Sequence, residues 1–92
     1  MVKTIWKFAF AINDLVSITM PEGSVPLHVE VQEGIACMWA IVDPEQPMTV
    51  RHFHVVGTGG PMPNTAGEHI GTFLQDVFVW HVFEHCNVTI NS

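Results

Sequence analysis

VPLHVEVQEGIACMWAIV, residues 25–42, is the stretch of sequence that decides the fold class. Its first half alternates apolar and polar residues, as a β-strand with one buried face does. The residues expected on that buried face are Val25, Leu27, Val29 and Val31. Pro26 suits an edge strand, and Glu33–Gly34 is a signal for a tight turn. The stretch therefore predicts a β-hairpin, with residues 25–32 and 35–42 as its two strands.

The same pattern continues on both sides of this hairpin. Short apolar segments alternate with turn signals such as PEGS (21–24) and DPEQP (43–47). Further strands are expected at residues 4–12, 15–20, 48–56, 69–74 and 77–84. Several short strands at this spacing are typical of an antiparallel sandwich or barrel. We expect a single all-β domain over residues 1–92, a small antiparallel β-sandwich or barrel of seven to eight short strands.

Residues 66–86 allow a second interpretation, because their apolar residues also fit a helix. Two observations favour strands. Val77, Phe78 and Val79 are residue types enriched in strands. Gly71 would cost about 1 kcal/mol in a helix interior.

The segments 35–42 and 77–84 are apolar on both faces. A small antiparallel domain covers one face of a sheet more easily than two, and an exposed apolar patch usually marks an interface. The residues expected to be partly exposed are Met38, Trp39, Phe78, Trp80 and Val82. We therefore expect a homo-oligomer; the alternative is a closed barrel covered by one short helix.

Composition excludes several classes of partner. The chain has three basic and nine acidic residues, and a net charge of −6 opposes binding to duplex DNA and to anionic membranes. No segment approaches the ~20 apolar residues of a membrane helix, and no signal peptide is visible. Two cysteines, Cys37 and Cys86, are too few for a disulfide scaffold. These features predict a soluble cytosolic protein with reduced thiols.

The segment RHFHVVGTGGPMP, residues 51–63, raises the question of a metal site. His52 and His54 would project from one face of a strand, about 6.5–7 Å apart. Further ligands would have to come from His28, His69, His81, His85 or a carboxylate. An HxH pair lacks the spacing specificity of an established zinc motif. We therefore expect no metal, with both histidines facing solvent or an interface while Phe53 and Val55 enter the core.

The glycine run within that segment has two interpretations. Its backbone N–H groups could form an anion-binding nest. Alternatively, Gly57, Gly59 and Gly60 supply positive φ angles in a turn, and Pro61 and Pro63 end the strand. The run lacks the G-x-G-x-x-G spacing and the lysine of a phosphate loop, so the turn is favoured.

Catalytic machinery has little support. The serines stand in no G-x-S-x-G context, and adjacency of His85 and Cys86 in sequence does not make a catalytic pair. Trp6, Trp39 and Trp80 can stack on a base or sugar, although such residues more often fill a small core. We expect no enzyme activity and no cofactor.

Five segments together resemble a family of small uncharacterised proteins encoded by bacteriophages and prophages. They are KTIWKF (3–8), WAIVDP (39–44), FHVVGTGGPMP (53–63), HIGTF (69–73) and VFVWHVFE (77–84). The resemblance covers nearly the whole chain and implies expression in the cytoplasm of an infected bacterial host, but it implies no reaction. The residues that match the family pattern are Trp6, Gly57, Thr58, Gly59, Pro61, Gly71, Thr72, His81 and Phe83.

A small phage protein without catalytic machinery is expected to act by binding. The sharpest hypothesis is a counter-defence sponge that sequesters a cyclic nucleotide signal of bacterial immunity. The candidate ligand-binding residues are Gly57, Thr58, Gly59, Gly60, Arg51, Trp6, Lys7 and His81. The net negative charge counts against an anionic ligand unless the few basic residues gather at one site. Two alternatives are a protein–protein interaction module for a host or virion protein, and a small histidine-based metalloprotein.

Overall fold

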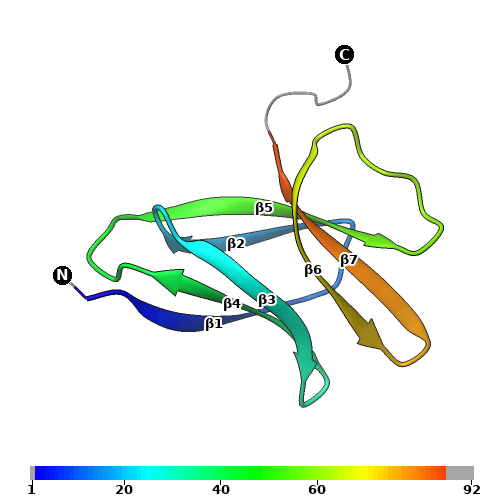
Figure 1. Ribbon diagram of the computed structural model, residues 1–92, viewed down its shortest axis with the longest axis horizontal. Helices are drawn as coiled ribbons and strands as arrows, with labels where there is room; N and C mark the ends of the chain where they lie inside the picture. Colours follow the sequence, from blue (N-terminus) through cyan, green and yellow to red (C-terminus); the bar gives the residue numbers. More distant parts are fainter. Residues whose placement is uncertain (1, 87–92) are drawn as a thin grey trace.

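The computed structural model describes residues 2–86 and shows an all-β protein (Figure 1). Its strands are β1 (Thr4–Phe10), β2 (Leu15–Pro21), β3 (Val25–Gln32), β4 (Ile35–Val42), β5 (Met48–Gly57), β6 (Ala66–Gln75) and β7 (Phe78–His85). They form two antiparallel sheets, ordered β1-β4-β3 and β2-β5-β7-β6. The expected fold class is therefore confirmed. None of the residues from 2 to 86 belongs to a helix that could cross a membrane.

The two sheets share one core, built from the inward face of each. Its members are Phe10, Val16, Ile18, Met20, Val29, Ala36, Met38, Phe53, Val55, Phe73 and Val82. Because successive side chains of a strand point to opposite faces, alternate residues of β2 and β5 enter this core. Phe53 and Val55 are buried as expected.

Turn chemistry sets the β3–β4 hairpin. Glu33 and Gly34 have φ angles of 51° and 81°, and two positive φ angles are what a two-residue type I′ turn requires.

Residues 66–86 are strands rather than a helix: β6 and β7 pair antiparallel along their length. Both expectations are confirmed.

The prediction that Val25 and Leu27 point inward is wrong. The side chains of Val25 and Leu27 are 51% and 44% exposed, because the register of β3 against β4 shifts between Pro26 and His28. A β-bulge inserts one residue and so reverses which face the preceding residues occupy. Beyond the bulge, the prediction for Val29 is confirmed, since that side chain is fully buried.

The prediction that Met38 and Val82 are partly exposed is also wrong, since both are fully buried. Each lies on the inward face of a strand with neighbours on both sides, β4 between β1 and β3, and β7 between β5 and β6. Phe78 is exposed as expected. Trp39 and Trp80 are half-buried.

Strand β6 joins the two sheets where it crosses β3. A Cβ atom built on Gly71 would lie 2.9 Å from Cγ2 of Val29 and 3.5 Å from its backbone nitrogen. Only glycine therefore lets the two backbones approach this closely. Two residues further along, the rings of Phe73 and Phe10 meet edge to face with centroids 6.2 Å apart. These contacts fix the β6–β7 hairpin, which carries most of the candidate site.

Candidate functional site

The outward surface of the four-stranded sheet carries five of the six histidines of the chain. On β5 and β7, alternation turns the histidines outward because their neighbours Phe53, Val55 and Val82 are buried in the core. We call this surface the histidine face, and its histidines are His52, His54, His69, His81 and His85. The sixth, His28, lies on β3 in the other sheet.

Hydroxyl groups link these imidazoles into short chains. The Oγ atom of Ser17 lies 2.8 Å from Nδ1 of His52. A longer chain runs from Thr58 Oγ1 to His81 Nε2 (2.9 Å), from His81 Nδ1 to Thr72 Oγ1 (2.9 Å), and on to His69 Nε2 (3.1 Å). Imidazoles and hydroxyls can both donate and accept hydrogen bonds, so these side chains make the face polar.

The glycine run forms the turn that leaves β5. The N–H of Gly60 donates to the carbonyl oxygen of Gly57 over 2.9 Å, and Gly59 has a φ of 89°. The prediction of positive φ holds only for Gly59. At Gly57 and Gly60 there is little room for a side chain. A Cβ on Gly57 would lie 3.2 Å from the Trp80 ring, and one on Gly60 would lie 3.1 Å from the Gly57 oxygen.

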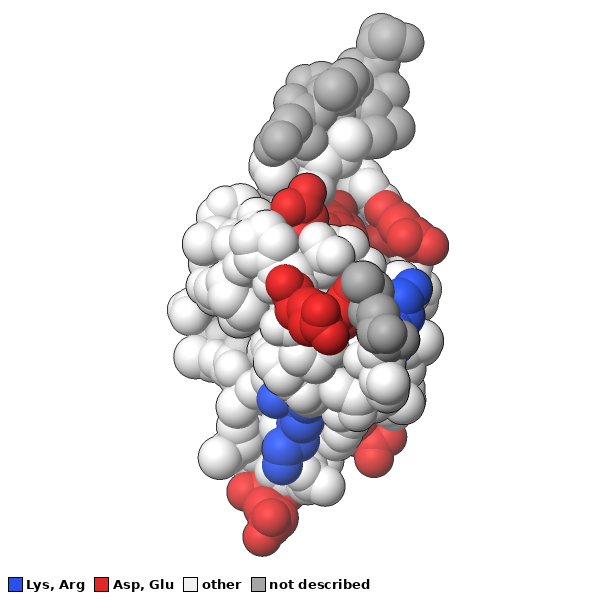
Figure 2. Space-filling view, turned by 90° about the vertical axis from the view of Figure 1, so that its left-hand side faces the viewer, with Lys and Arg blue, Asp and Glu red and all other residues white. Residues whose placement is uncertain are grey.

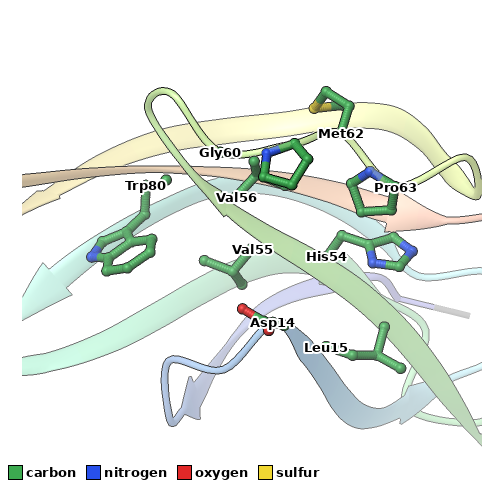
Figure 3. Close-up of a pocket in the computed structure, with 11 residues that line it drawn as sticks. Asp14, Leu15, His54, Val55, Val56, Gly60, Met62, Pro63 and Trp80 are labelled. Atoms are coloured by element: carbon green, nitrogen blue, oxygen red, sulfur yellow. The ribbon is translucent and has the colours of Figure 1, made fainter.

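A pocket of about 480 Å³ lies under the loop between β5 and β6 (Figure 3). It is lined by Asp14, Leu15, His54, Val55, Val56, Gly57, Gly60, Pro61, Met62, Pro63 and Trp80. The volume falls within the range of small-molecule sites. Its walls are mainly apolar, and His54 and Asp14 are the titratable side chains among the residues that line it.

A second pocket of about 350 Å³ shares Gly57 and Trp80 with the first. It is lined by Gly57, Thr58, Val77, Phe78, Val79 and Trp80. The rings of Phe78 and Trp80 are stacked, with centroids 5.8 Å apart and an interplanar angle of 29°. Phe78 is 56% exposed, so one aromatic face is free beside the glycine turn.

His54 differs from the other members of the histidine face because it is buried. Its Nε2 atom lies 3.0 Å from Thr65 Oγ1 and 3.0 Å from His85 Nδ1. Burial, and secondarily the neighbouring His85, lower the pKa of His54 below its ordinary value of 6.5. The side chain is therefore held neutral at physiological pH.

The structure brings some of the predicted ligand-binding residues together and separates the others. The residues brought together are Gly57, Thr58, Gly59, Gly60 and His81. Arg51 points into the sandwich, where Nε and Nη2 each donate to a carboxylate oxygen of Glu84 over 2.7 Å. In the other sheet, Lys7 Nζ donates to Gln32 over 2.7 Å, and Trp6 packs near Phe8 with ring centroids 6.3 Å apart.

Basic side chains are therefore not concentrated at this site. The face drawn in Figure 2, on the side away from the glycine turn, carries small, separate basic patches with acidic side chains beside them. Lys3 lines a different hollow together with Glu22 and Asp43. Any anion bound at the glycine turn would therefore rely on hydrogen bonds without a lysine or arginine beside it.

The sequence analysis did not name Thr65, and it expected Phe78 only as an exposed residue. It named His69 and His85 only as possible metal ligands, Trp80 only as a possible stacking residue and Thr72 only as a match to the family pattern. The alternation along β7 would have placed His81 and His85 on one face. The pairing of His54 with His85 depends on β5 lying next to β7, which no local pattern indicates.

Metal binding has no ready-made site in the described part of the chain. Among residues 2–86, no three His, Cys, Asp or Glu side chains stand close enough together to hold an ion. The ring centroids of His52 and His85 are 6.1 Å apart and those of His54 and His85 are 5.1 Å apart. The expected absence of a metal stays a prediction.

Comparison with known proteins gives one family. No curated protein and no solved structure matches the chain significantly. A family model described as a domain of unknown function (DUF7352) matches residues 1–90, nearly the whole chain. This match shows that the chain, with its two antiparallel sheets and its histidine face, belongs to the DUF7352 family.

Proposed function

We propose that this protein is a phage-encoded binding protein that sequesters a small cyclic nucleotide in the cytoplasm of the infected host. One observation carries the proposal. Gly57, Thr58 and the exposed Phe78 line the same small pocket, and the Thr58 hydroxyl, at its edge, is also hydrogen-bonded to His81. Phosphate donors and an aromatic platform are the two elements that nucleotide binding needs.

Each element has a definite role in the proposed complex. A base stacks on the free face of Phe78, an interaction worth about 1–3 kcal/mol per base. A phosphate oxygen accepts hydrogen bonds from the Thr58 hydroxyl and from an N–H of His81, once their mutual bond is exchanged for the ligand.

Sequestration requires that the ligand is held and not cleaved. The His81 imidazole is engaged at both ring nitrogens, by Thr58 and by Thr72. In the proposed complex one ring nitrogen of His81 donates to the phosphate and the other stays engaged by Thr72, so neither is directed at a nucleophile. The arrangement therefore favours binding over catalysis.

Thermal shift with cyclic di- and trinucleotides tests the proposal. A ligand at 100 times its Kd stabilises a protein by about 2.7 kcal/mol, so the Tm of this small domain should rise by roughly 10 °C. The Phe78→Ala and Thr58→Val variants should lose most of that rise. Lys7→Gln, which alters the other sheet, should keep it.

The bound nucleotide should also be recovered intact after the protein is denatured. Recovery of cleaved nucleotide would mean an enzyme. If no cyclic nucleotide raises the Tm, the sponge proposal fails.

The outward face of the β1-β4-β3 sheet supports a second candidate function, a protein interaction module. Ile5, Ile41 and Val25 are direct cross-strand partners and form one apolar row across all three strands. Ile5 and Val25 are 56% and 51% exposed, and Leu27 and Ile35 extend the same apolar character. Exposed apolar rows of this kind mark interfaces.

Self-association is the form of this candidate that we propose. Light scattering at micromolar concentration should give a mass of at least twice the 10.2 kDa of the chain. Ile5→Glu should lower the mass toward that of one chain, because a charge in the row would have to be desolvated on association. The matched Leu74→Glu variant, at an exposed residue of the other sheet, should not. A wild-type mass of 10.2 kDa, that of one chain, would contradict self-association.

A further inference from the structure

The loop between β5 and β6 is fastened to the histidine face by a side-chain contact. Thr65 Oγ1 and His85 Nδ1 each lie 3.0 Å from Nε2 of His54. The segment from Gly60 to Pro63 lines one side of the 480 Å³ pocket, and Pro63 lies beside His54 (Figure 3). The contact therefore joins the pocket's covering loop to its floor.

The response of this contact to pH depends on how many protons His54 and His85 carry together. When both histidines are neutral, the single lone pair on Nε2 of His54 accepts from the Nδ1–H of His85 or from the Thr65 hydroxyl. A first proton is tolerated, because His54 can donate from Nε2 while His85 shifts its remaining proton to the other nitrogen. A second proton is not tolerated, since Nε2–H of His54 and Nδ1–H of His85 would then point at each other over 3.0 Å.

The charged and titratable groups around the histidine pair come from several elements. From β5, His52 faces His85, with ring centroids 6.1 Å apart, and can only add positive charge. From the segment before β2, Asp14 lines the same pocket as His54. On β6, Ala66 pairs with His85 and Glu68 follows. Glu84, the neighbour of His85 on β7, is committed to Arg51.

We propose that His54, His85 and Thr65 form an acid-sensitive latch that holds residues 60–63 over the pocket and releases them when the histidine pair takes up its second proton. The base of the loop stays fixed, because the N–H of Cys86 donates to the carbonyl oxygen of Thr65 over 2.7 Å. Opening is therefore a swing of the loop, and the sheet stays folded. The latch goes beyond nucleotide binding and needs no ligand to be tested.

The direction of the His54 pKa agrees with this geometry. Burial lowers that pKa below 6.5, so an opened or unfolded state, where the histidine is solvated, binds protons more readily. The closed loop is therefore fully favoured above pH 6.5 and loses stability as the pH falls below it. Each pKa unit of separation between the closed and open states favours opening by a factor of about ten.

Backbone ¹⁵N relaxation measured at pH 7.5 and pH 5.0 on the full chain tests the latch. At pH 7.5 the amides of Gly60 and Met62 should have order parameters near about 0.85, as in rigid backbone. At pH 5.0 they should fall below about 0.6, while those of β5 and β7 stay unchanged. Unchanged order parameters of Gly60 and Met62 at pH 5.0 would overturn the proposal.

Variants of the two latch histidines separate the latch from a general effect of acid. In His85→Asn the side-chain amide replaces Nδ1 as hydrogen-bond partner but cannot be protonated, so the loop should stay ordered at pH 5.0. His54→Gln removes the other titration and should do the same, which keeps the test open if one variant does not fold. The control His69→Gln, on the same face but outside the latch, should open like the wild type. Opening of both latch variants at pH 5.0 would contradict the proposal.

Discussion

Replacing Phe73 with alanine is expected to lower the free energy of unfolding by about 3–5 kcal/mol. The Phe73 ring is 2% exposed and meets Phe10 of the other sheet edge to face. Its removal leaves a cavity at the place where β6 ties the two sheets together. A small domain has a total stability of about 5–15 kcal/mol, so urea denaturation followed by circular dichroism should show a large loss.

Phe78→Ala is the matched control for this prediction. Phe78 lies in the same β6–β7 hairpin but is 56% exposed, and its loss should cost less than about 1 kcal/mol. The two variants should therefore separate stability from binding: Phe73→Ala destabilises the fold, and Phe78→Ala removes the ligand-induced rise in Tm. Equal losses of stability would show that the hairpin is packed differently.

Arg51→Ala is expected to destabilise the protein by about 3 kcal/mol, the lower end for breaking a buried ion pair because this pair is partly exposed. Arg51 donates two hydrogen bonds to Glu84 and a third to the carbonyl oxygen of Ser24. The Arg51 and Glu84 side chains are only 20% and 25% exposed. Truncation leaves the Glu84 carboxylate without its ion-pair partner between the sheets. The loss of stability should appear in urea denaturation without any ligand.

A double-mutant cycle with Glu84→Ala separates this structural role from a role in binding. If the two residues act as a pair, the double variant should cost clearly less than the sum of the single variants. The sequence suggested instead that Arg51 meets a phosphate. Unchanged stability in Arg51→Ala together with a lost nucleotide response would support that earlier hypothesis over the ion pair.

The sequence by itself determined the strands and most of the core. Alternation with period two is a local property, so Val16, Ile18 and Met20 could be assigned to the buried face from their spacing alone. The turn at Glu33–Gly34 is equally local, because two residues with positive φ are enough to reverse the chain. The strand preference of its residues also correctly predicted strands, rather than a helix, in the segment 66–86.

Only the tertiary structure decided which strands became neighbours and in which register. Strand β5 lies between β2 and β7, neither of which adjoins it in sequence. That order brings Glu84 to Arg51 and His85 to His54, so one predicted ligand residue is consumed by an ion pair and an unpredicted histidine pair appears. The bulge after Pro26 similarly exposes Val25 against its local pattern. The physical reason is that side-chain alternation fixes a face within each strand, whereas pairing energy is spread over contacts between segments far apart in the chain.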